Sequence, residues 1–161
     1  MELPKDFREL LGLFNSHKVE YIVVGGYALA FHGSPRYTGD IDLFVKPDPH
    51  NAKKILDALK DFGFSSSKLA PEDFSEPDKV VQLGAPPLRV DIISSISGVT
   101  WPEAEKNKVS ADFNGLHINF IGRKDFINNK KATARHKDLA DVEAIEKPAS
   151  VRRKIKTGQK K

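Results

Sequence analysis

Apolar residues recur along this chain with two different periods, and each period predicts one kind of element. The segment 5–17, KDFRELLGLFNSH, repeats its large apolar side chains every three or four residues, which is typical of an amphipathic helix. The segment 51–62 has the same spacing and is followed by Gly63, a common helix end. Three further helices are expected in 27–33, 123–135 and 136–147.

Shorter apolar runs between turn-forming residues predict strands. Five such runs occupy 20–24, 40–46, 79–83, 88–93 and 116–122. The polar stretch 65–78 is expected to be a loop, and 94–110 is ambiguous, with a short helix after Pro102. Because strands and helices alternate, the pattern predicts an α/β (α+β) domain in which helices flank a mixed β-sheet.

Length and composition fit one soluble domain and exclude several other classes. At 161 residues, with 39% hydrophobic and 30% charged content, the chain is long enough to bury a core. It has no cysteine, so a disulfide framework and a thiolate zinc site are excluded. No apolar stretch approaches about 20 residues, so we expect no membrane span and a cytoplasmic location.

Charge is distributed unevenly along the chain. The formal net charge is +4, but residues 147–161 hold seven Lys or Arg and no acid, which leaves residues 1–146 at −3. We therefore expect a folded domain over 1–146 and a basic, flexible tail over 147–161. Such a tail is most often solvated, and the alternative is contact with a nucleic-acid backbone.

The stretch VVGGYALAFHGSPRYTGDIDLFV, residues 23–45, contains two carboxylates where the pattern predicts a strand. Asp40 and Asp42 are separated by one residue, so on a strand they point to the same side. Asp91 lies on another predicted strand, again on the face opposite the apolar side chains. If these strands are neighbours, three carboxylates converge, and such a group destabilises a fold unless a cation neutralises it.

Mg²⁺ is the cation that these ligands favour, because it prefers oxygen donors and keeps waters and substrate phosphates in its remaining positions. Two such ions, with Mn²⁺ as an alternative, can hold the attacking and leaving oxygens of a phosphoryl transfer. Gly25-Gly26 lies between a strand and a helix start, where the backbone can approach a phosphate closely. Ser34 and Arg36 lie in the loop before the acids, and the Arg36 guanidinium can bind a phosphate through two N–H groups.

Gly25-Gly26, a gap of thirteen residues, Asp40-Ile-Asp42 and a later Asp91 together resemble the motifs of the DNA polymerase beta-like nucleotidyltransferase superfamily. The local form GGYALAFHGSPRYTGDIDLFV and the later NKKATARHKDLADVEAI are similar to its AbiEii/MenA-type branch, which includes toxins of small bacterial toxin–antitoxin pairs. The resemblance covers about residues 20–146 and implies the nucleotidyltransferase fold.

The resemblance implies roles for the residues that match. Asp40, Asp42 and Asp91 would be the catalytic residues that bind the metal ions, and Asp91 would also be the base toward the incoming hydroxyl. Gly25 and Gly26 would cradle the phosphates of the nucleotide.

The resemblance extends to the C-terminal helices, where Lys131 would contact the triphosphate and Asp138 matches a further acid of the branch. If the helix were continuous, Lys131, Arg135 and Asp138 would share one face that could reach a bound triphosphate. The alternative is an exposed helix with routine ion pairs. Members of the branch often have Gly where this chain has Ala134, which matters only if the backbone there needs a positive φ.

Together these observations predict a metal-dependent nucleotidyltransferase that moves a nucleoside monophosphate from a nucleoside triphosphate to a hydroxyl. The acceptor would be RNA or tRNA, a protein side chain or a small molecule, and the basic tail favours RNA. Two alternatives stay open. One is a non-catalytic, nucleotide-binding or partner-binding protein of a toxin–antitoxin or defence pair, with an antitoxin or other protein as its partner. The other is an inactive structural module.

Overall fold

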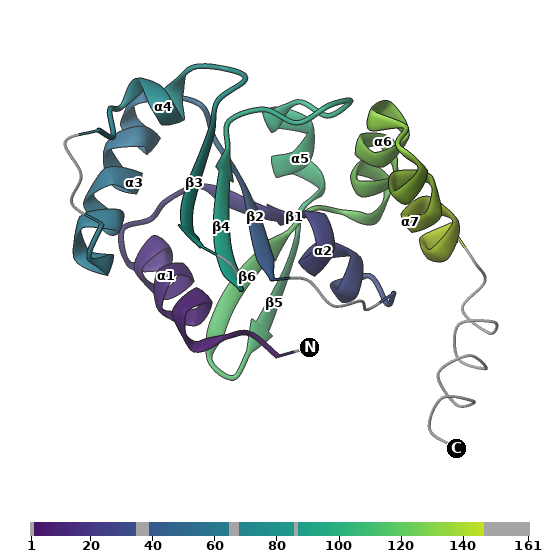
Figure 1. The fold of residues 1–161 in the computed structure, drawn as a ribbon, viewed down its shortest axis with the longest axis horizontal. Helices are drawn as coiled ribbons and strands as arrows, with labels where there is room; N and C mark the ends of the chain where they lie inside the picture. The colour runs from purple at the N-terminus through teal and green to yellow at the C-terminus, as the bar shows by residue number, and fades with distance from the viewer. Residues whose placement is uncertain (1, 35–38, 65–67, 86, 147–161) are drawn as a thin grey trace.

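The computed structural model describes residues 2–34, 39–64, 68–85 and 87–146. They form one six-stranded sheet with helices on both sides of it (Figure 1). The strands are β1 (Tyr21–Val24), β2 (Asp40–Val45), β3 (Val80–Ala85), β4 (Leu88–Ile93), β5 (Val109–Phe113) and β6 (Leu116–Phe120). The helices are α1 (Lys5–Ser16), α2 (Gly25–Phe31), α3 (Pro49–Phe62), α4 (Glu72–Ser75), α5 (Trp101–Asn107), α6 (Arg123–Thr133) and α7 (His136–Glu146).

The strand order is β3-β4-β2-β1-β6-β5, with both parallel and antiparallel neighbours. The pairs β2–β4 and β1–β6 are parallel, whereas β1–β2, β3–β4 and β5–β6 are antiparallel. The predicted mixed sheet flanked by helices is therefore confirmed. The order also makes β2 the direct neighbour of both β1 and β4, and this neighbourhood positions the candidate site.

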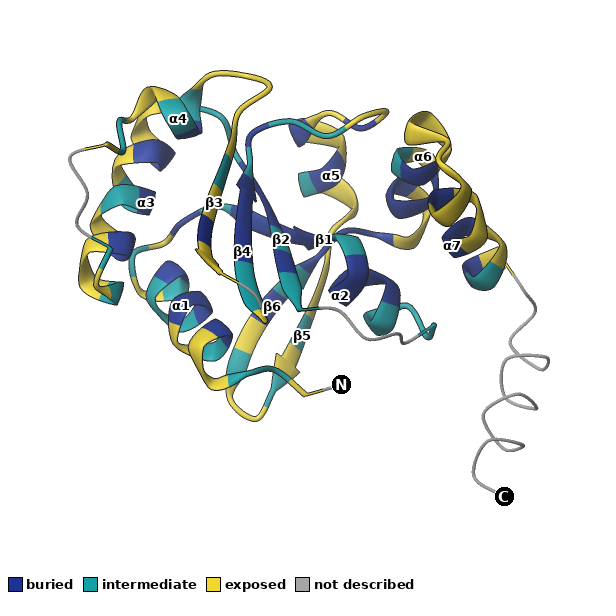
Figure 2. Ribbon diagram, viewed as in Figure 1, coloured by how far each residue is buried: buried dark blue, intermediate teal, exposed yellow. Residues whose placement is uncertain are grey.

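Burial follows the strand order (Figure 2). The inner strands β1, β2 and β4 are mostly buried, whereas the edge strands β3 and β5 are largely exposed. Helix α1 buries the four residues of its predicted apolar stripe, and α3 packs against it. Helix α3 begins where the Asp48 carboxylate accepts a hydrogen bond from the Asn51 N–H and ends at Gly63, whose φ of 108° suits only glycine.

Two elements were not predicted from the pattern. Strand β5 begins at the end of the stretch 94–110 that sequence analysis left ambiguous and continues beyond it, and the short helix α4 lies inside the expected polar loop. Both contribute little apolar surface, since all but one residue of α4 and every residue of β5 are at least partly exposed. A periodic hydrophobic signal is therefore missing in both segments.

The two predicted C-terminal helices are confirmed as separate helices, because α6 ends at Thr133 and α7 begins at His136. In the part of the chain that the structure describes, no helix is both long enough and apolar enough to cross a membrane. The predicted tail, 147–161, and the loop residue Arg36 lie outside the described residues.

Candidate active site

Three carboxylates meet on one face of the sheet, across β2 and β4. Asp40 and Asp42 stand two residues apart on β2, and parallel pairing places Asp42 directly opposite Asp91 of β4. The two facing side chains are close enough for Asp42, when protonated, to donate a hydrogen bond to Asp91. Two segments about fifty residues apart in the chain are thereby brought together as the sequence predicted.

Negative charge is in excess around Asp42. Burial raises the pKa of Asp42 to about 6, and the charge of Asp91, a hydrogen bond with Asp91 and the charge of Asp40 act in the same direction. The charge of Lys130 opposes these effects. Such a carboxylate is held at a free-energy cost near neutral pH, which is the condition that a bound cation relieves.

The guanidinium of Arg89 lies among these acids. Arg89 pairs with Asp40 in the β2–β4 register and precedes Asp91 by two residues, so its side chain lies on the same face. One guanidinium nitrogen, Nη2, lies 2.9 Å from Asp40 Oδ2, and Nε lies 3.1 Å from Asp91 Oδ1. Sequence analysis assigned Arg89 no role.

Gly25 brings the main chain against Asp42. The antiparallel β1–β2 register pairs Val24 with Asp42, so the next residue begins α2 beside that carboxylate. A Cβ atom at position 25 would overlap the Asp42 carboxylate, and the φ of +70° at this residue also favours glycine. The adjacent Gly26 is buried. Sequence analysis predicted that the backbone here approaches a phosphate closely. In the structure the backbone lies against the Asp42 carboxylate.

The acids fit a hard divalent cation by their chemistry, although their arrangement is not that of a metal site. Three carboxylate groups on one face, with Gly25 in contact with one of them, form an oxygen-rich set of the kind that Mg²⁺ prefers. Within the described ranges, however, no group of three or more His, Cys, Asp or Glu side chains is arranged to hold a metal ion. The Arg89 guanidinium lies between Asp40 and Asp91.

A second charged cluster joins α6 to α7, and its Lys130, Asp138 and Asp141 are buried. Asp138, with 0% of its side chain exposed, accepts hydrogen bonds from Lys130 Nζ at 3.3 Å, Thr133 Oγ1 at 2.7 Å and Arg135 Nε at 2.6 Å. Burial opposes its ionised form, but these hydrogen bonds and the charge of Lys130 outweigh burial and hold the pKa of Asp138 well below its usual range. Lys130 also lies 3.5 Å from Asp141.

Of Lys130 and the adjacent Lys131, Lys130 is the lysine whose charge lowers the pKa of Asp42. Lys130 is buried, and its charge reaches Asp42. Lys131 is exposed and pairs with Glu146 at 3.3 Å. A signal for Lys130 was present in the sequence, because it follows the apolar residues Phe126 and Ile127 by four and three positions and so shares their buried face.

The break between α6 and α7 determines where Arg135 and Asp138 lie. Ala134 ends α6 with a φ of 54°, in the left-handed region where glycine is favoured. The continuous helix that would align Lys131, Arg135 and Asp138 therefore does not form. Arg135 and Asp138 are instead joined to each other by the hydrogen bonds described above, so a nucleotide contact for them stays a prediction.

Ser34 follows α2 and donates its backbone N–H to Leu29 O at 3.1 Å. This contact ties the start of the predicted loop to α2. The structure thus brings together the acids and Gly25, while the phosphate contacts predicted for Ser34 and Arg36 stay predictions.

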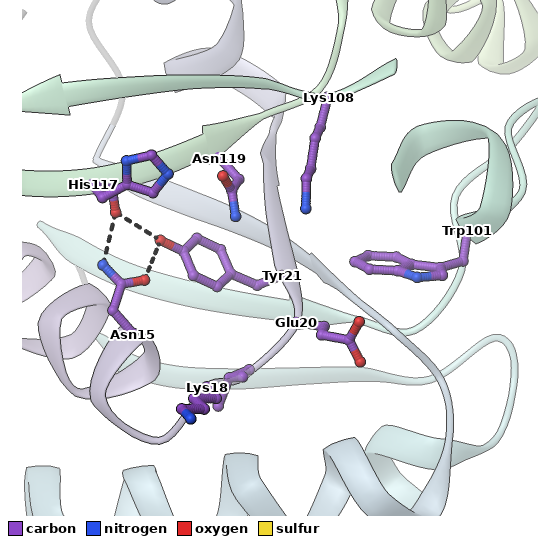
Figure 3. Close-up of a pocket in the computed structure, with 9 residues that line it drawn as sticks. Asn15, Lys18, Glu20, Tyr21, Trp101, Lys108, His117 and Asn119 are labelled. Carbon is purple, nitrogen blue, oxygen red and sulfur yellow. Dashed lines mark hydrogen bonds between the residues drawn. The ribbon is translucent and has the colours of Figure 1, made fainter. Parts of the chain in front are cut away.

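A separate pocket of about 360 Å³ opens at the other end of β1 (Figure 3). It is lined by Asn15, Lys18, Val19, Glu20, Tyr21, Trp101, Lys108, His117 and Asn119. At one end Tyr21 donates a hydrogen bond to Asn15 Oδ1 at 3.0 Å, and burial raises the pKa of Tyr21 to about 12. None of the three acids lines this pocket, and Tyr21 begins β1 whereas Gly25 follows its last residue. The pocket is therefore distinct from the acidic face.

The sequence profile of the family described as "Nucleotidyl transferase of unknown function (DUF2204)" matches residues 4–161. The chain belongs to this nucleotidyltransferase family. No curated protein matches this nucleotidyltransferase. The family description agrees with the superfamily resemblance carried by Gly25-Gly26 and the three acids, and it does not extend to the AbiEii/MenA-type branch.

Solved structures share the fold of this nucleotidyltransferase. The lincosamide antibiotic adenylyltransferase LnuA, with lincomycin bound, has a TM-score of 0.59 at 16% identity, over 89% of this chain and 96% of that one. An antigenic nucleotidyltransferase-like protein from Paracoccidioides brasiliensis has a TM-score of 0.54 at 18% identity, over 89% and 77%. The antibiotic-resistance factor ANT(2'')-Ia has a TM-score of 0.56 at 11% identity, over 87% and 80%. At these identities the likeness concerns the fold alone.

Proposed function

We propose that the chain is a metal-dependent nucleotidyltransferase that moves a nucleoside monophosphate from a nucleoside triphosphate to a hydroxyl acceptor. The observation that carries this proposal is the pairing of Asp42 with Asp91 across β2 and β4, with Gly25 against the Asp42 carboxylate. A structural role does not account well for this arrangement, since burial and like charges raise the pKa of Asp42 to about 6.

Asp40, Asp42 and Asp91 would hold the metal ions, Mg²⁺ or Mn²⁺. When bound, such ions neutralise charge on the phosphates and on the leaving pyrophosphate. The backbone at Gly25 and Gly26 would receive the phosphates beside the Asp42 carboxylate, which lies against Gly25. Asp91 would accept the proton of the attacking hydroxyl, whose oxygen forms a bond to the α-phosphorus as the bond to pyrophosphate breaks.

The α6–α7 segment supports the site through Lys130. Its charge reaches Asp42, while Asp138 and Asp141 hold its ammonium in place. We therefore assign to Lys130 the electrostatic role that the sequence resemblance gave to Lys131. In this proposal Arg135 and Asp138 are positioning residues that keep the two helices and Lys130 in register with the sheet.

For the acceptor we propose RNA, because the basic segment 147–161, with seven Lys or Arg and no acid, suits a phosphate backbone. We further propose that the chain belongs with the AbiEii/MenA-type branch and acts in a toxin–antitoxin or defence pair. The motif RHKDLAD, residues 135–141, supports this assignment. LnuA is an antibiotic adenylyltransferase, so a small-molecule acceptor is the alternative outcome of the test.

The test is to incubate the protein with each α-labelled nucleoside triphosphate, Mg²⁺ and total RNA. We expect label in RNA, and its loss on addition of a chelator and in Asp42→Asn. Asp57→Asn is the matched control, since this acid is exposed on α3, away from the acidic face. Label in protein or in a small hydroxyl compound would keep the chemistry and change the acceptor. No label and no pyrophosphate release with any acceptor would contradict the proposal.

A further inference from the structure

The guanidinium of Arg89 occupies space between two of the proposed metal-binding acids. Its Nη2 lies 2.9 Å from Asp40 Oδ2 and 3.3 Å from Asp91 Oδ2, and its Nε lies 3.1 Å from Asp91 Oδ1. Asp91 is thus held by two parallel N–H groups, which is the strong, bidentate form of this ion pair. The contact joins β2 to β4 at the site itself.

This placement follows from the strand register and needs no special loop conformation. Arg89 faces Asp40 across the parallel pair, and Asp91 comes two residues later on the same strand. All three side chains therefore lie on one face of the sheet. The Arg89 side chain is 31% exposed, so it has room to move without disturbing the buried core.

We infer that Arg89 is an internal counter-ion that competes with the divalent ions for Asp40 and Asp91. This inference rests on the proposed function, because it assumes that the acids bind metal. Carboxylate oxygens that accept hydrogen bonds from a guanidinium are not free on that side to coordinate a cation. A divalent ion placed in the same space would also stand beside a like charge. Arg89 therefore has to leave this position when metal binds.

The contacts of Arg89 have opposite effects on the metal-free protein and on metal binding. Arg89 neutralises part of the charge of the acids and stabilises the metal-free protein. It lowers the affinity for metal by the same interaction, since the bonds to Asp40 and Asp91 are lost on binding. A residue that only braced the two strands would not oppose metal in this way.

The experiment measures Mn²⁺ binding by electron paramagnetic resonance of the free ion, in wild type and in Arg89→Met, without nucleotide. We expect Arg89→Met to bind Mn²⁺ roughly tenfold more tightly and to unfold at a lower temperature without metal. Arg89→Lys keeps the charge, so we expect its Mn²⁺ affinity to stay near the wild-type value. Arg8→Met is the matched control, because Arg8 also donates two hydrogen bonds, to Phe113 O and Asn114 O.

The outcomes separate this inference from the proposed function. If wild type binds Mn²⁺ and Arg89→Met binds it equally or more weakly, competition is wrong while metal dependence stands. If neither protein binds Mn²⁺ at millimolar concentration, the metal site and the competition are both wrong. If Arg89→Met does not fold, Arg89→Gln replaces it, with the same tightening expected. Equal tightening in Arg8→Met would show that the effect is not specific to Arg89.

Discussion

The acidic face of the sheet and the α6–α7 cluster contain the same kinds of residue in opposite states. On the sheet, the Arg89 guanidinium pairs with two of the three carboxylates, the side chain of Asp40 is 40% exposed, and the pKa of Asp42 is raised to about 6. Between the helices, Asp138 is 0% exposed, its oxygens are taken by several donors, and its pKa is lowered. Near neutral pH the acidic face therefore lowers the free energy of unfolding, whereas the α6–α7 cluster raises it.

This difference distinguishes a functional carboxylate from a structural one. An ionised acid that has its full set of hydrogen bonds holds elements together and has no capacity left for a ligand. An acid kept beside other acids needs another partner, and a substrate with its metal ions can provide one. The predictions below test this contrast, beginning with the largest expected effect.

Asp42→Asn is expected to abolish activity and to increase stability. Removing one metal-binding carboxylate should lower the rate of nucleotidyl transfer by at least about 10³-fold. The free energy of unfolding of the metal-free protein at pH 8 should rise by about 1–3 kcal/mol, because a buried, repelled charge is removed. Urea unfolding measures the second effect, and a loss of stability in Asp42→Asn would contradict the contrast.

Asp138→Asn is expected to have the opposite effect on stability. The change leaves Lys130 buried with one acid fewer and leaves Arg135 without its partner. Breaking a buried charge pair from one side costs about 3–5 kcal/mol. Urea unfolding of both Asn variants at about pH 7 should therefore give changes in the free energy of unfolding that have opposite signs. Changes of the same sign would remove the distinction between the two clusters.

The dependence of stability on pH is expected to separate the clusters a second time. The pKa of Asp42 is raised above its unfolded value, so folding favours its protonated form. Its contribution to the free energy of unfolding is therefore fully present below about pH 4 and is lost as the pH rises to about 6. The loss amounts to about 3 kcal/mol. Asp138 has a lowered pKa, so its ionised form contributes to the free energy of unfolding above about pH 4, and this contribution is lost in acid.

Urea unfolding of the metal-free protein across this pH range provides the measurement. In Asp42→Asn the fall in stability between about pH 4 and pH 6 should disappear, while the loss in stronger acid should remain. An unchanged profile in this variant would show that another group causes the fall.

The adjacent lysines offer a matched pair of substitutions. Lys130→Met should lower the free energy of unfolding by about 3 kcal/mol, because two buried acids lose their shared cation. Lys131→Met removes an exposed pair with Glu146 and should cost less than about 1 kcal/mol. Thermal or urea unfolding checks the difference, and equal costs would mean that Lys130 is not the residue that joins the helices to the site.

Ala134→Gly is expected to give the smallest effect, a gain of about 0.5–1 kcal/mol. Ala134 has a φ of 54°, where a Cβ atom is strained and glycine is not. Activity should stay at the wild-type level, because the break between α6 and α7 is already present. A loss of stability in this variant would show that the entropy of the unfolded chain outweighs the strain.

Much of the fold and part of the site could be predicted from the sequence. The two-residue spacing of Asp40 and Asp42 determined that they share a face, and the Gly-Gly turn after β1 indicated a close approach of the backbone. Strand β5 could not be predicted because an exposed edge strand has no buried stripe. Residue type alone could not identify which adjacent lysine is buried, although the positions of Phe126 and Ile127 held that information.

By itself, the sequence determined which faces carry acid, which segments bury apolar side chains and where the chain must turn, because these follow from local spacing and backbone sterics. The register between β2 and β4 was decided only by the tertiary structure, since pairing of distant strands depends on the whole sheet. That register places Asp91 opposite Asp42 and Arg89 opposite Asp40. The break at Ala134 likewise divided the expected stripe: Lys131 is exposed and pairs with Glu146, whereas Arg135 binds the buried Asp138.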